Sequence, residues 1–193
     1  MNLLEKPYWI FDLDGTLTVA MHDFEAFRSS AGLPSGVPIL EALDAVSGPE
    51  AAALHVKLAD WERDVARLSL LQPGALALVS ALAAREHSLG ILTRNLREIA
   101  FETLDAVGLR SFFRDQTVIG RDEAPPKPDP GGVDKLLRAW GARSAEAVLV
   151  GDFRFDLQAG RAAGTTTVYI DPSGDFPDAE HADHCIRALA ELL

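Results

Sequence analysis

Short runs of apolar, β-branched and aromatic residues recur along the chain, and most of them are continuous rather than alternating in polarity. Continuous runs of this length are typical of strands that are buried on both faces of a parallel sheet. The pattern therefore predicts strands over residues 8–11, 88–92, 117–119, 147–150 and 166–170.

The segments between most of these runs show apolar residues at helical spacing. They predict helices over residues 75–85, 96–107, 131–140 and 154–163. Gly108 and Gly164 stand directly after two of these helices, where glycine commonly ends a helix. Strands that alternate with helices of this length indicate βαβ units, so the predicted fold class is α/β, with a Rossmann-like three-layer core around a central parallel sheet.

One interval breaks the alternation. Residues 18–73, here called the helical insert, lie between the first two predicted strands and contain no convincing strand of their own. They predict a small all-α cap inserted after the first strand. The predicted domains are thus a discontinuous α/β core, residues 1–17 and 74–193, and a helical cap, residues 18–73.

The longest helix of the insert is predicted over residues 49–71. Pro49 suits the first turn of a helix, and the Pro73-Gly74 pair follows its end. Its apolar residues follow a spacing of four and three, which predicts one stripe that packs against other helices. The stripe comprises Leu54, Leu58, Trp61, Val65 and Leu68.

Composition narrows the class of protein. The chain has 193 residues, of which 48% are hydrophobic and 24% charged, as expected of a globular protein. A net charge of −11 argues against a nucleic-acid or anionic-membrane surface, which needs clustered Lys and Arg. The single cysteine, Cys185, lies in a fragment that resembles a short strand and excludes an internal disulfide or CxxC zinc site. With no signal-peptide pattern and no membrane span, a cytoplasmic protein is expected.

Polar residues that terminate the predicted strands carry the candidate chemistry. In an open α/β sheet, ligands bind outside the carboxyl ends of the strands. A cluster of carboxylates there must protonate or bind a cation, and oxygen ligands suit Mg²⁺. With a hydroxyl and an ammonium nearby, the cluster predicts a phosphoryl-transfer site with a carboxylate nucleophile. Its members are Asp12 and Asp14, Thr93, Lys127, and Asp152 with Asp156.

The same residues resemble the four motifs of the haloacid dehalogenase-like superfamily. Residues 11–17, Phe-Asp-Leu-Asp-Gly-Thr-Leu, resemble its first motif, and Thr93 ends a strand as its second motif does. Lys127 matches the third motif, in a Lys-Pro-Asp-Pro setting similar to the phosphoglycolate-phosphatase-like subgroup. Gly151-Asp152, followed by Asp156, resembles the fourth motif. The order of the motifs and the helical insert extend the resemblance over nearly the whole chain.

The resemblance implies a role for each matching residue. Asp12 would attack phosphorus and form an aspartyl-phosphate, and Asp14 would protonate the leaving alcohol and then activate water. Thr93 would bind the phosphoryl group, and Lys127 would stabilise the charge on it. Mg²⁺ would be held by Asp12, the Asp14 backbone carbonyl, Asp152 and, directly or through a neighbour, Asp156. Residues expected to contact substrate are Gly15, Thr16, Arg94 and Asn95.

Several residues keep an alternative structural interpretation. Thr93 or Asn95 could cap the helix that follows, and Asp156 could be an acid favoured in the first turn of a helix. Arg94 could grip a second acidic group on the substrate or lie on the surface. For His22, Asp23 and Arg28 in the insert, solvated positions are favoured over positions that face the site.

The sequence also departs from the subgroup. Phe153 stands where Ser is common, and a second aromatic residue, Phe155, follows it. These departures concern the substrate more than the reaction.

The sequence thus predicts a Mg²⁺-dependent phosphatase that hydrolyses a small phosphorylated metabolite, acting as a monomer or homodimer. A phosphomutase would use the same residues. A phospho-aspartate signalling module or a non-catalytic binding protein is an alternative from another class. The four site acids and one lysine sum to −3, so a phosphate ester is expected to bind only together with a divalent cation.

Overall fold

The computed structural model describes residues 3–193 and contains a parallel sheet of six strands. The strand order is β3-β2-β1-β4-β5-β6, so β1 lies in the centre. All five predicted strands are confirmed, and the fragment around Cys185 forms a sixth at the sheet edge. The strands are β1 (Tyr8–Phe11), β2 (Ser88–Leu92), β3 (Val118–Ile119), β4 (Ala147–Gly151), β5 (Thr166–Ile170) and β6 (His184–Ile186).

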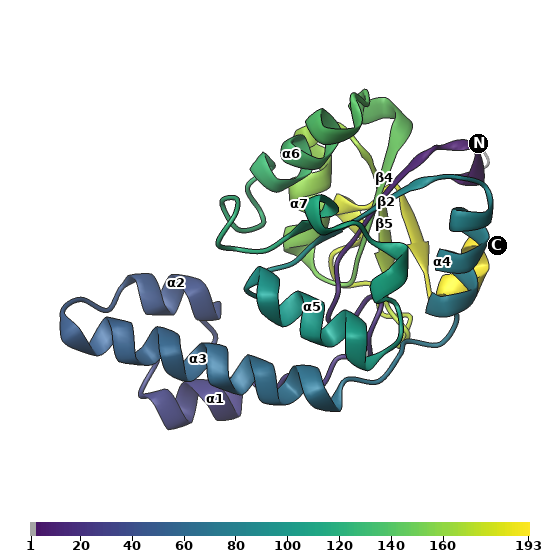
Figure 1. Ribbon diagram of the computed structural model, residues 1–193. Coiled ribbons are helices and arrows are strands. Elements are labelled where there is room, and N and C mark those ends of the chain that lie inside the picture. The colour runs from purple at the N-terminus through teal and green to yellow at the C-terminus, as the bar shows by residue number, and fades with distance from the viewer. Residues whose placement is uncertain (1–2) are drawn as a thin grey trace.

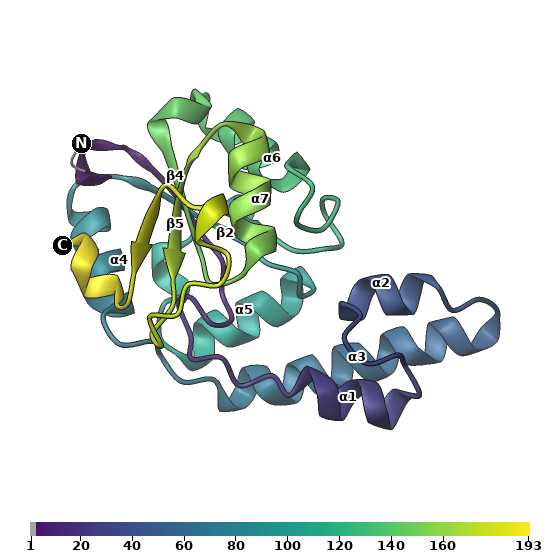
Figure 2. The same ribbon diagram turned by 180° about the vertical axis from the view of Figure 1, so that it is seen from behind.

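Helices cover both faces of this sheet and confirm the predicted three layers (Figure 1). One face carries α4 (Ala75–Ala84) and α5 (Arg97–Ala106), and the other carries α6 (Gly131–Trp140) and α7 (Arg154–Ala163). Figure 2 shows the second pair from behind. Short 3₁₀ turns connect these elements at Leu3–Glu5, Arg110–Phe112, Asp115–Thr117, Ser144–Glu146, Ala179–His181 and Leu189–Leu192.

Alternate residues of the central strand face opposite sides of the sheet, which gives the protein two apolar layers. Trp9 and Phe11 pack into the larger cluster with α4 and α5, whereas Ile10 packs with α6 and α7. All three side chains are fully buried, as the continuous apolar run predicts. In residues 3–193 we find no helix of the length and apolarity needed to cross a membrane.

The helical insert forms three helices with an apolar cluster of their own, α1 (Phe24–Ala31), α2 (Ile39–Asp44) and α3 (Pro49–Leu68). The predicted stripe on α3 is only partly correct. Leu58 is fully buried, but Leu68 is 67% exposed. The buried row instead continues to Glu62 and Ala66, at steps of four residues, because α3 packs on α5 as well as on α1 and α2.

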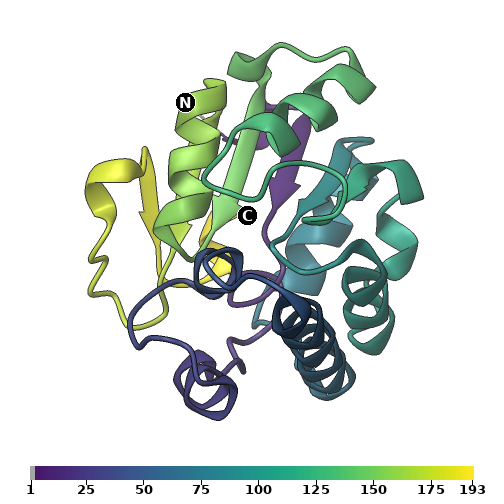
Figure 3. The same cartoon turned by 90° about the vertical axis from the view of Figure 1, so that its left-hand side faces the viewer.

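The insert lies beyond the carboxyl ends of the strands, whose arrows point toward it in Figure 3. The two chain segments that join it to the core run side by side. The Val19 N–H donates to the Leu70 carbonyl, and the Gln72 N–H donates to the Leu17 carbonyl, both at 2.9 Å. The domain boundaries at 17/18 and 73/74, and the role of the insert as a cap, stay predictions.

Candidate active site

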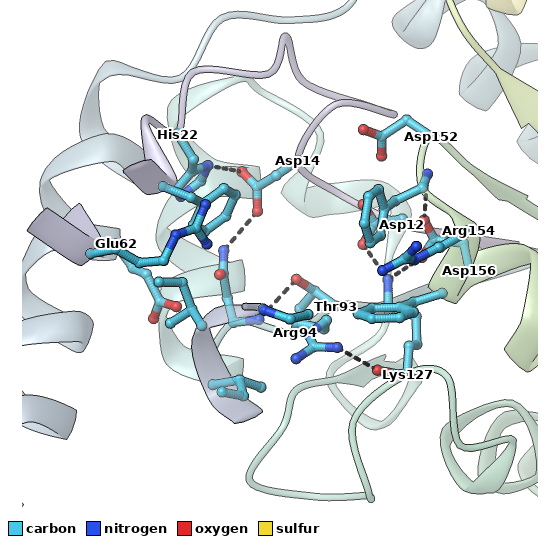
Figure 4. A pocket seen from close by; sticks show the side chains of 18 of the residues that line it. Asp12, Asp14, His22, Glu62, Thr93, Arg94, Lys127, Asp152, Arg154 and Asp156 are labelled. Atoms are coloured by element: carbon cyan, nitrogen blue, oxygen red, sulfur yellow. Dashed lines mark hydrogen bonds and ion pairs between the residues drawn. The ribbon is translucent and has the colours of Figure 1, made fainter. Parts of the chain in front are cut away.

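A cavity of about 380 Å³ lies between the strand ends and the helical insert (Figure 4). Its core wall contains the residues that the sequence places at strand ends. Its other wall comes from the insert, through α1, α2, α3 and the loops before α1 and α2. The six clustered side chains on the core wall are Asp12, Asp14, Thr93, Lys127, Asp152 and Asp156.

The first acid is positioned by the sheet itself. The Asp12 N–H donates to the Val150 carbonyl at 2.9 Å, so the ladder between β1 and β4 extends one residue beyond β1. The chain then turns sharply at Gly15, whose φ is +89°. A Cβ at this glycine would lie 2.1 Å from an Asp152 carboxylate oxygen, so the turn and the acid after β4 fit together only because position 15 lacks a side chain.

Lys127 joins two of the acids. Its Nζ lies 2.5 Å from Oδ1 of Asp12 and 2.5 Å from Oδ1 of Asp156, and it also donates to the Leu92 carbonyl at 2.7 Å. The lysine is 3% exposed. Burial acts to lower the pKa of Lys127, but the two carboxylates outweigh it and raise that pKa. The lysine is therefore a fixed positive charge between two acids rather than a solvated linker residue.

Asp152 has no such partner. Its carboxylate accepts the Thr16 hydroxyl at 3.1 Å, and no cationic side chain in residues 3–193 pairs with it. Burial, followed by the charges of Asp12 and Asp156, raises the pKa of Asp152 well above the ordinary value. Burial likewise raises the pKa of Asp156 to about 6, with Lys127 opposing that shift. The site therefore carries more negative charge than its lysine neutralises.

This donor set fits a divalent cation. Asp12, Asp152 and Asp156 each offer a carboxylate oxygen, and these oxygens all lie within 4.8 Å of one another. An all-oxygen set with carboxylates in excess is what Mg²⁺ prefers. The side chain of Asp14 does not join the set, which is compatible with the expectation that its backbone carbonyl is the ligand.

The Asp14 side chain faces the insert instead. Its Oδ2 accepts the Asn95 amide at 2.7 Å, and its Oδ1 lies 3.8 Å from Nδ1 of His22. Burial raises the pKa of Asp14 to about 6, although the Asn95 hydrogen bond opposes the shift. A carboxyl group with this pKa can both donate and accept a proton near neutral pH.

Thr93 is buried directly after β2, where its hydroxyl accepts the Asn95 N–H at 3.1 Å. The alternative that Thr93 or Asn95 caps the next helix is wrong. Helix α5 begins at Arg97 after Leu96, which makes no side-chain cap, and the Arg97 N–H donates to the Asp122 carboxylate at 3.0 Å.

The sequence model described as haloacid dehalogenase-like hydrolase matches residues 9–170. The chain belongs to this family. A pyrophosphatase PpaX from Halalkalibacterium halodurans is 30% identical and covers 95% of this chain and 94% of its own. A phosphoglycolate phosphatase from Rhodospirillum rubrum is 32% identical, covering 83% and 78% respectively. A solved hydrolase structure from Pseudomonas syringae has the same fold, with a TM-score of 0.78, 22% identity, and 96% and 95% coverage.

The residues expected to contact substrate in this hydrolase have different surroundings. Gly15 and Thr16 do not line the cavity, and Thr16 is fully buried with its hydroxyl donating to Asp152. Both therefore support Asp152, and their contact with substrate stays untested. Arg94 does line the cavity, but it donates to the Lys127 carbonyl at 2.7 Å and to Glu41 on α2 at 2.6 Å. Its guanidinium thus already has an acidic partner.

The insert wall of the hydrolase contains residues that sequence reasoning missed or misplaced. His22 and Arg28 line the cavity, so the solvated interpretation is wrong for them, whereas Asp23 is exposed and caps α1. Burial lowers the pKa of His22 to about 4, so its ring is neutral near neutral pH. Glu62 was not recognised at all. It is 4% exposed and pairs with Arg121 at 2.7 Å, and only its spacing of four residues from Leu58 marks it as buried.

Proposed function

We propose that this protein is a Mg²⁺-dependent phosphatase that hydrolyses small phosphate monoesters through an aspartyl-phosphate at Asp12. The contact of Lys127 with Asp12, beside an unneutralised Asp152, carries the proposal. It combines a carboxylate nucleophile with one fixed cation and a place for a second. The family membership and the phosphatase and pyrophosphatase relatives support the same chemistry.

In the first half-reaction, an Asp12 carboxylate oxygen attacks phosphorus, and the bond between phosphorus and the leaving-group oxygen breaks. Asp14 donates its proton to that oxygen, so the alcohol leaves neutral. The raised pKa of Asp14 supports this role, because a share of the carboxyl groups is protonated near neutral pH. Asn95 holds the Asp14 carboxyl group in place.

In the second half-reaction, water attacks the phosphorus of the aspartyl-phosphate, and its proton passes to Asp14. The bond between phosphorus and the Asp12 oxygen breaks, which releases inorganic phosphate and restores both acids. Lys127 stabilises the negative charge on Asp12 and on the phosphoryl oxygens throughout. Thr93, buried at the end of β2, is positioned to bind a phosphoryl oxygen.

Asp12, the Asp14 carbonyl, Asp152 and Asp156 would hold Mg²⁺, which when bound neutralises the acids and polarises the phosphoryl group. The helical insert would cover the site, exclude bulk water and contact the leaving group. The expected location of the protein is the cytoplasm, and it would act as a monomer or homodimer.

The direct test is release of inorganic phosphate from a panel of phosphate monoesters, with Mg²⁺ and with a chelator. We expect turnover only with the metal, and a fall of roughly 10⁴-fold or more in Asp12→Asn. Asp105→Asn, an exposed acid on α5, is the matched control and should keep wild-type activity. Acid-quenched wild-type protein should carry the mass of one phosphoryl group, and Asp12→Asn should not. Full activity of Asp12→Asn would contradict the assignment of Asp12 as the nucleophile.

The same assay separates the alternatives. A phosphomutase would return the phosphoryl group to a hexose 1-phosphate at another position instead of releasing phosphate. A signalling module would hold the phosphoryl group without turnover, and a binding protein would neither acquire nor release it.

A further inference from the structure

The three residues between Asp152 and Asp156 have no part in the proposed reaction, yet all of them line the cavity. Phe153 is 46% exposed, and its ring meets that of Phe155 edge to face, with centroids 5.0 Å apart. The Arg154 guanidinium lies 5.5 Å from the first ring centroid and 5.3 Å from the second. An arginine is thus supported by two aromatic rings at the side of the phosphoryl site.

Arg154 differs from every other cation that lines the cavity. Lys127 contacts Asp12 and Asp156, Arg28 pairs with Glu25 at 2.7 Å, and Arg94 pairs with Glu41 at 2.6 Å. Among residues 3–193, Arg154 has no acidic partner, and its guanidinium contacts the two rings. Its N–H groups therefore remain available to a ligand.

Arg154 carries its positive charge at a position of the fold where a cation is unfavourable. It is the first residue of α7, where the partial positive charge of the helix disfavours a cation and favours an anion. A side chain chosen for helix stability would be acidic or neutral here. Both rings contact the Arg154 guanidinium through cation–π interactions, although Phe155 also contacts the Arg94 guanidinium at 4.8 Å. The N–H groups of Arg154 are left free for hydrogen bonds to a carboxylate or phosphate.

We propose that Arg154, supported by Phe153 and Phe155, binds a second anionic group on the leaving-group side of the substrate. This inference rests on the proposed phosphatase function and names its substrate class, phosphate esters that carry a further carboxylate or phosphate. Arg94, for which the sequence left open either this role or a surface position, already donates to Glu41 and to the Lys127 carbonyl. Arg154 has no such partner among the described residues and is therefore the better candidate for the second anionic group.

Matched substrate pairs test the proposal. 3-Phosphoglycerate and glycerol 3-phosphate differ by a carboxylate in place of a hydroxymethyl group, and ribose 1,5-bisphosphate and ribose 5-phosphate differ by a phosphate. We expect wild-type protein to prefer the more anionic member of at least one pair, and the pair that responds identifies the acid. Arg154→Gln should lower kcat/KM for that member by about 10–100-fold, mainly through KM, and change the other member less than about threefold. Arg154→Lys should recover only part of the loss, because it restores the charge without the planar fork.

Arg161→Gln is the control, because this arginine is exposed on the same helix, outside the cavity, and donates to the Glu180 carbonyl. Its substrate preference should match the wild type. An Arg154→Gln protein with unchanged preference, while wild type hydrolyses esters, would overturn the inference and leave the phosphatase intact. If no ester is hydrolysed, the phosphatase proposal fails instead, and calorimetric binding of the four esters to wild-type protein with Mg²⁺ still decides. Equal affinity within both pairs, or affinities that Arg154→Gln does not alter, would again overturn the anion subsite.

Discussion

The two walls of the cavity hold their charged groups in different ways. On the core wall, Lys127 lies between Asp12 and Asp156 and contacts both, and all three side chains are deeply buried, while Asp14 and Asp152 are partly buried beside them. On the insert wall, His22 is neutral, and the one buried acid, Glu62, is bound to an arginine of the core. Apolar residues from α2 and the loop before it supply much of the remaining surface.

The difference follows from how each wall is built. Core residues follow strands directly, so the backbone ladder of a buried sheet sets their spacing. Insert residues come from three helices and the loops beside them, whose orientation depends on their own packing, on the packing of α3 against α5 and on ion pairs to the core. Under the proposed function, the core wall would carry the reaction and the insert wall would contact the leaving group.

Apart from the loss of the nucleophile in Asp12→Asn, removal of the core lysine should have the largest effect. In Lys127→Met we expect kcat to fall by roughly 10²–10³-fold, because one preorganised charge contributes about that much to transition-state stabilisation. The metal-free protein should also lose about 3–5 kcal/mol of unfolding free energy, since two buried carboxylates lose the only cationic partner they have among residues 3–193. Lys135→Met is the control, because its ammonium lies 3.9 Å from Glu123 and its side chain is 41% exposed. Steady-state kinetics and urea unfolding measure both effects, and a variant that keeps more than a tenth of wild-type kcat would contradict the prediction.

Because Asp152 has no cationic partner in the described part of the chain, binding of Mg²⁺ at the core wall should stabilise the folded protein. At a Mg²⁺ concentration about 100 times the Kd, the wild-type unfolding free energy should rise by about 2.7 kcal/mol. Asp152→Asn removes the carboxylate that has no cationic partner and should abolish most of this rise. Asp175→Asn, an exposed acid elsewhere on the surface, should leave it unchanged. Chemical unfolding with and without the metal measures the effect without any substrate. A wild-type protein that gains nothing from Mg²⁺ would argue against the site.

The core wall could be predicted from sequence because its signals are local. Asp12, Thr93 and Asp152 each follow the last apolar residues of a strand, so their meeting at one sheet edge follows from the α/β pattern alone. Lys127 lies in an irregular proline-rich segment, so only its place before the helix that leads to the fourth strand, together with its resemblance to a known motif, pointed to the site. The order of the strands likewise required the structure, because apolar runs do not state which strands are neighbours.

The insert wall could not be predicted, because its contacts join distant parts of the chain. Glu41 meets Arg94, and Glu62 meets Arg121, across 53 and 59 positions of sequence. A glutamate on an amphipathic helix ordinarily indicates a solvated face, and the packing of α3 on α5 overrides that indication. The same packing leaves Leu68 exposed at the end of the predicted stripe.

The buried acid of the insert should make stability depend on pH. Burial raises the pKa of Glu62 to about 7 from 4.5, with the Arg121 hydrogen bond opposing the shift. Between these values the native protein holds the proton more firmly than the unfolded chain. The contribution of Glu62 is therefore fully present below pH 4.5 and is lost as pH rises through 7, by on the order of 3 kcal/mol.

Urea unfolding of wild type and Glu62→Gln at pH 5 and pH 8 measures this contribution. The variant cannot titrate at this position, so its stability should fall less between the two values than that of the wild type. Glu50→Gln, exposed on the same helix, should follow the wild type. Burial lowers the pKa of His22 to about 4. Its titration contributes equally to the pH dependence of all three proteins and therefore cancels when they are compared. Equal slopes for Glu62→Gln and wild type would show that Glu62 titrates alike in both states.

The smallest effect is expected at the exposed contact between insert and core. Arg63 on α3 lies 2.6 Å from Glu98 and 3.0 Å from Glu102 on α5, but the side chains of these acids are 64% and 38% exposed. Arg63→Ala should therefore lower the unfolding free energy by only about 0.5–1 kcal/mol, and less still in about 1 M salt, which screens exposed charges. Arg67→Ala, whose guanidinium is 63% exposed, should cost less again. A loss above about 2 kcal/mol in Arg63→Ala would contradict the prediction, because it would mean that this contact is as strong as the buried ion pairs of the core wall. An insert able to move over the site requires the smaller value, because weak contacts are the ones that can open and reform in each cycle.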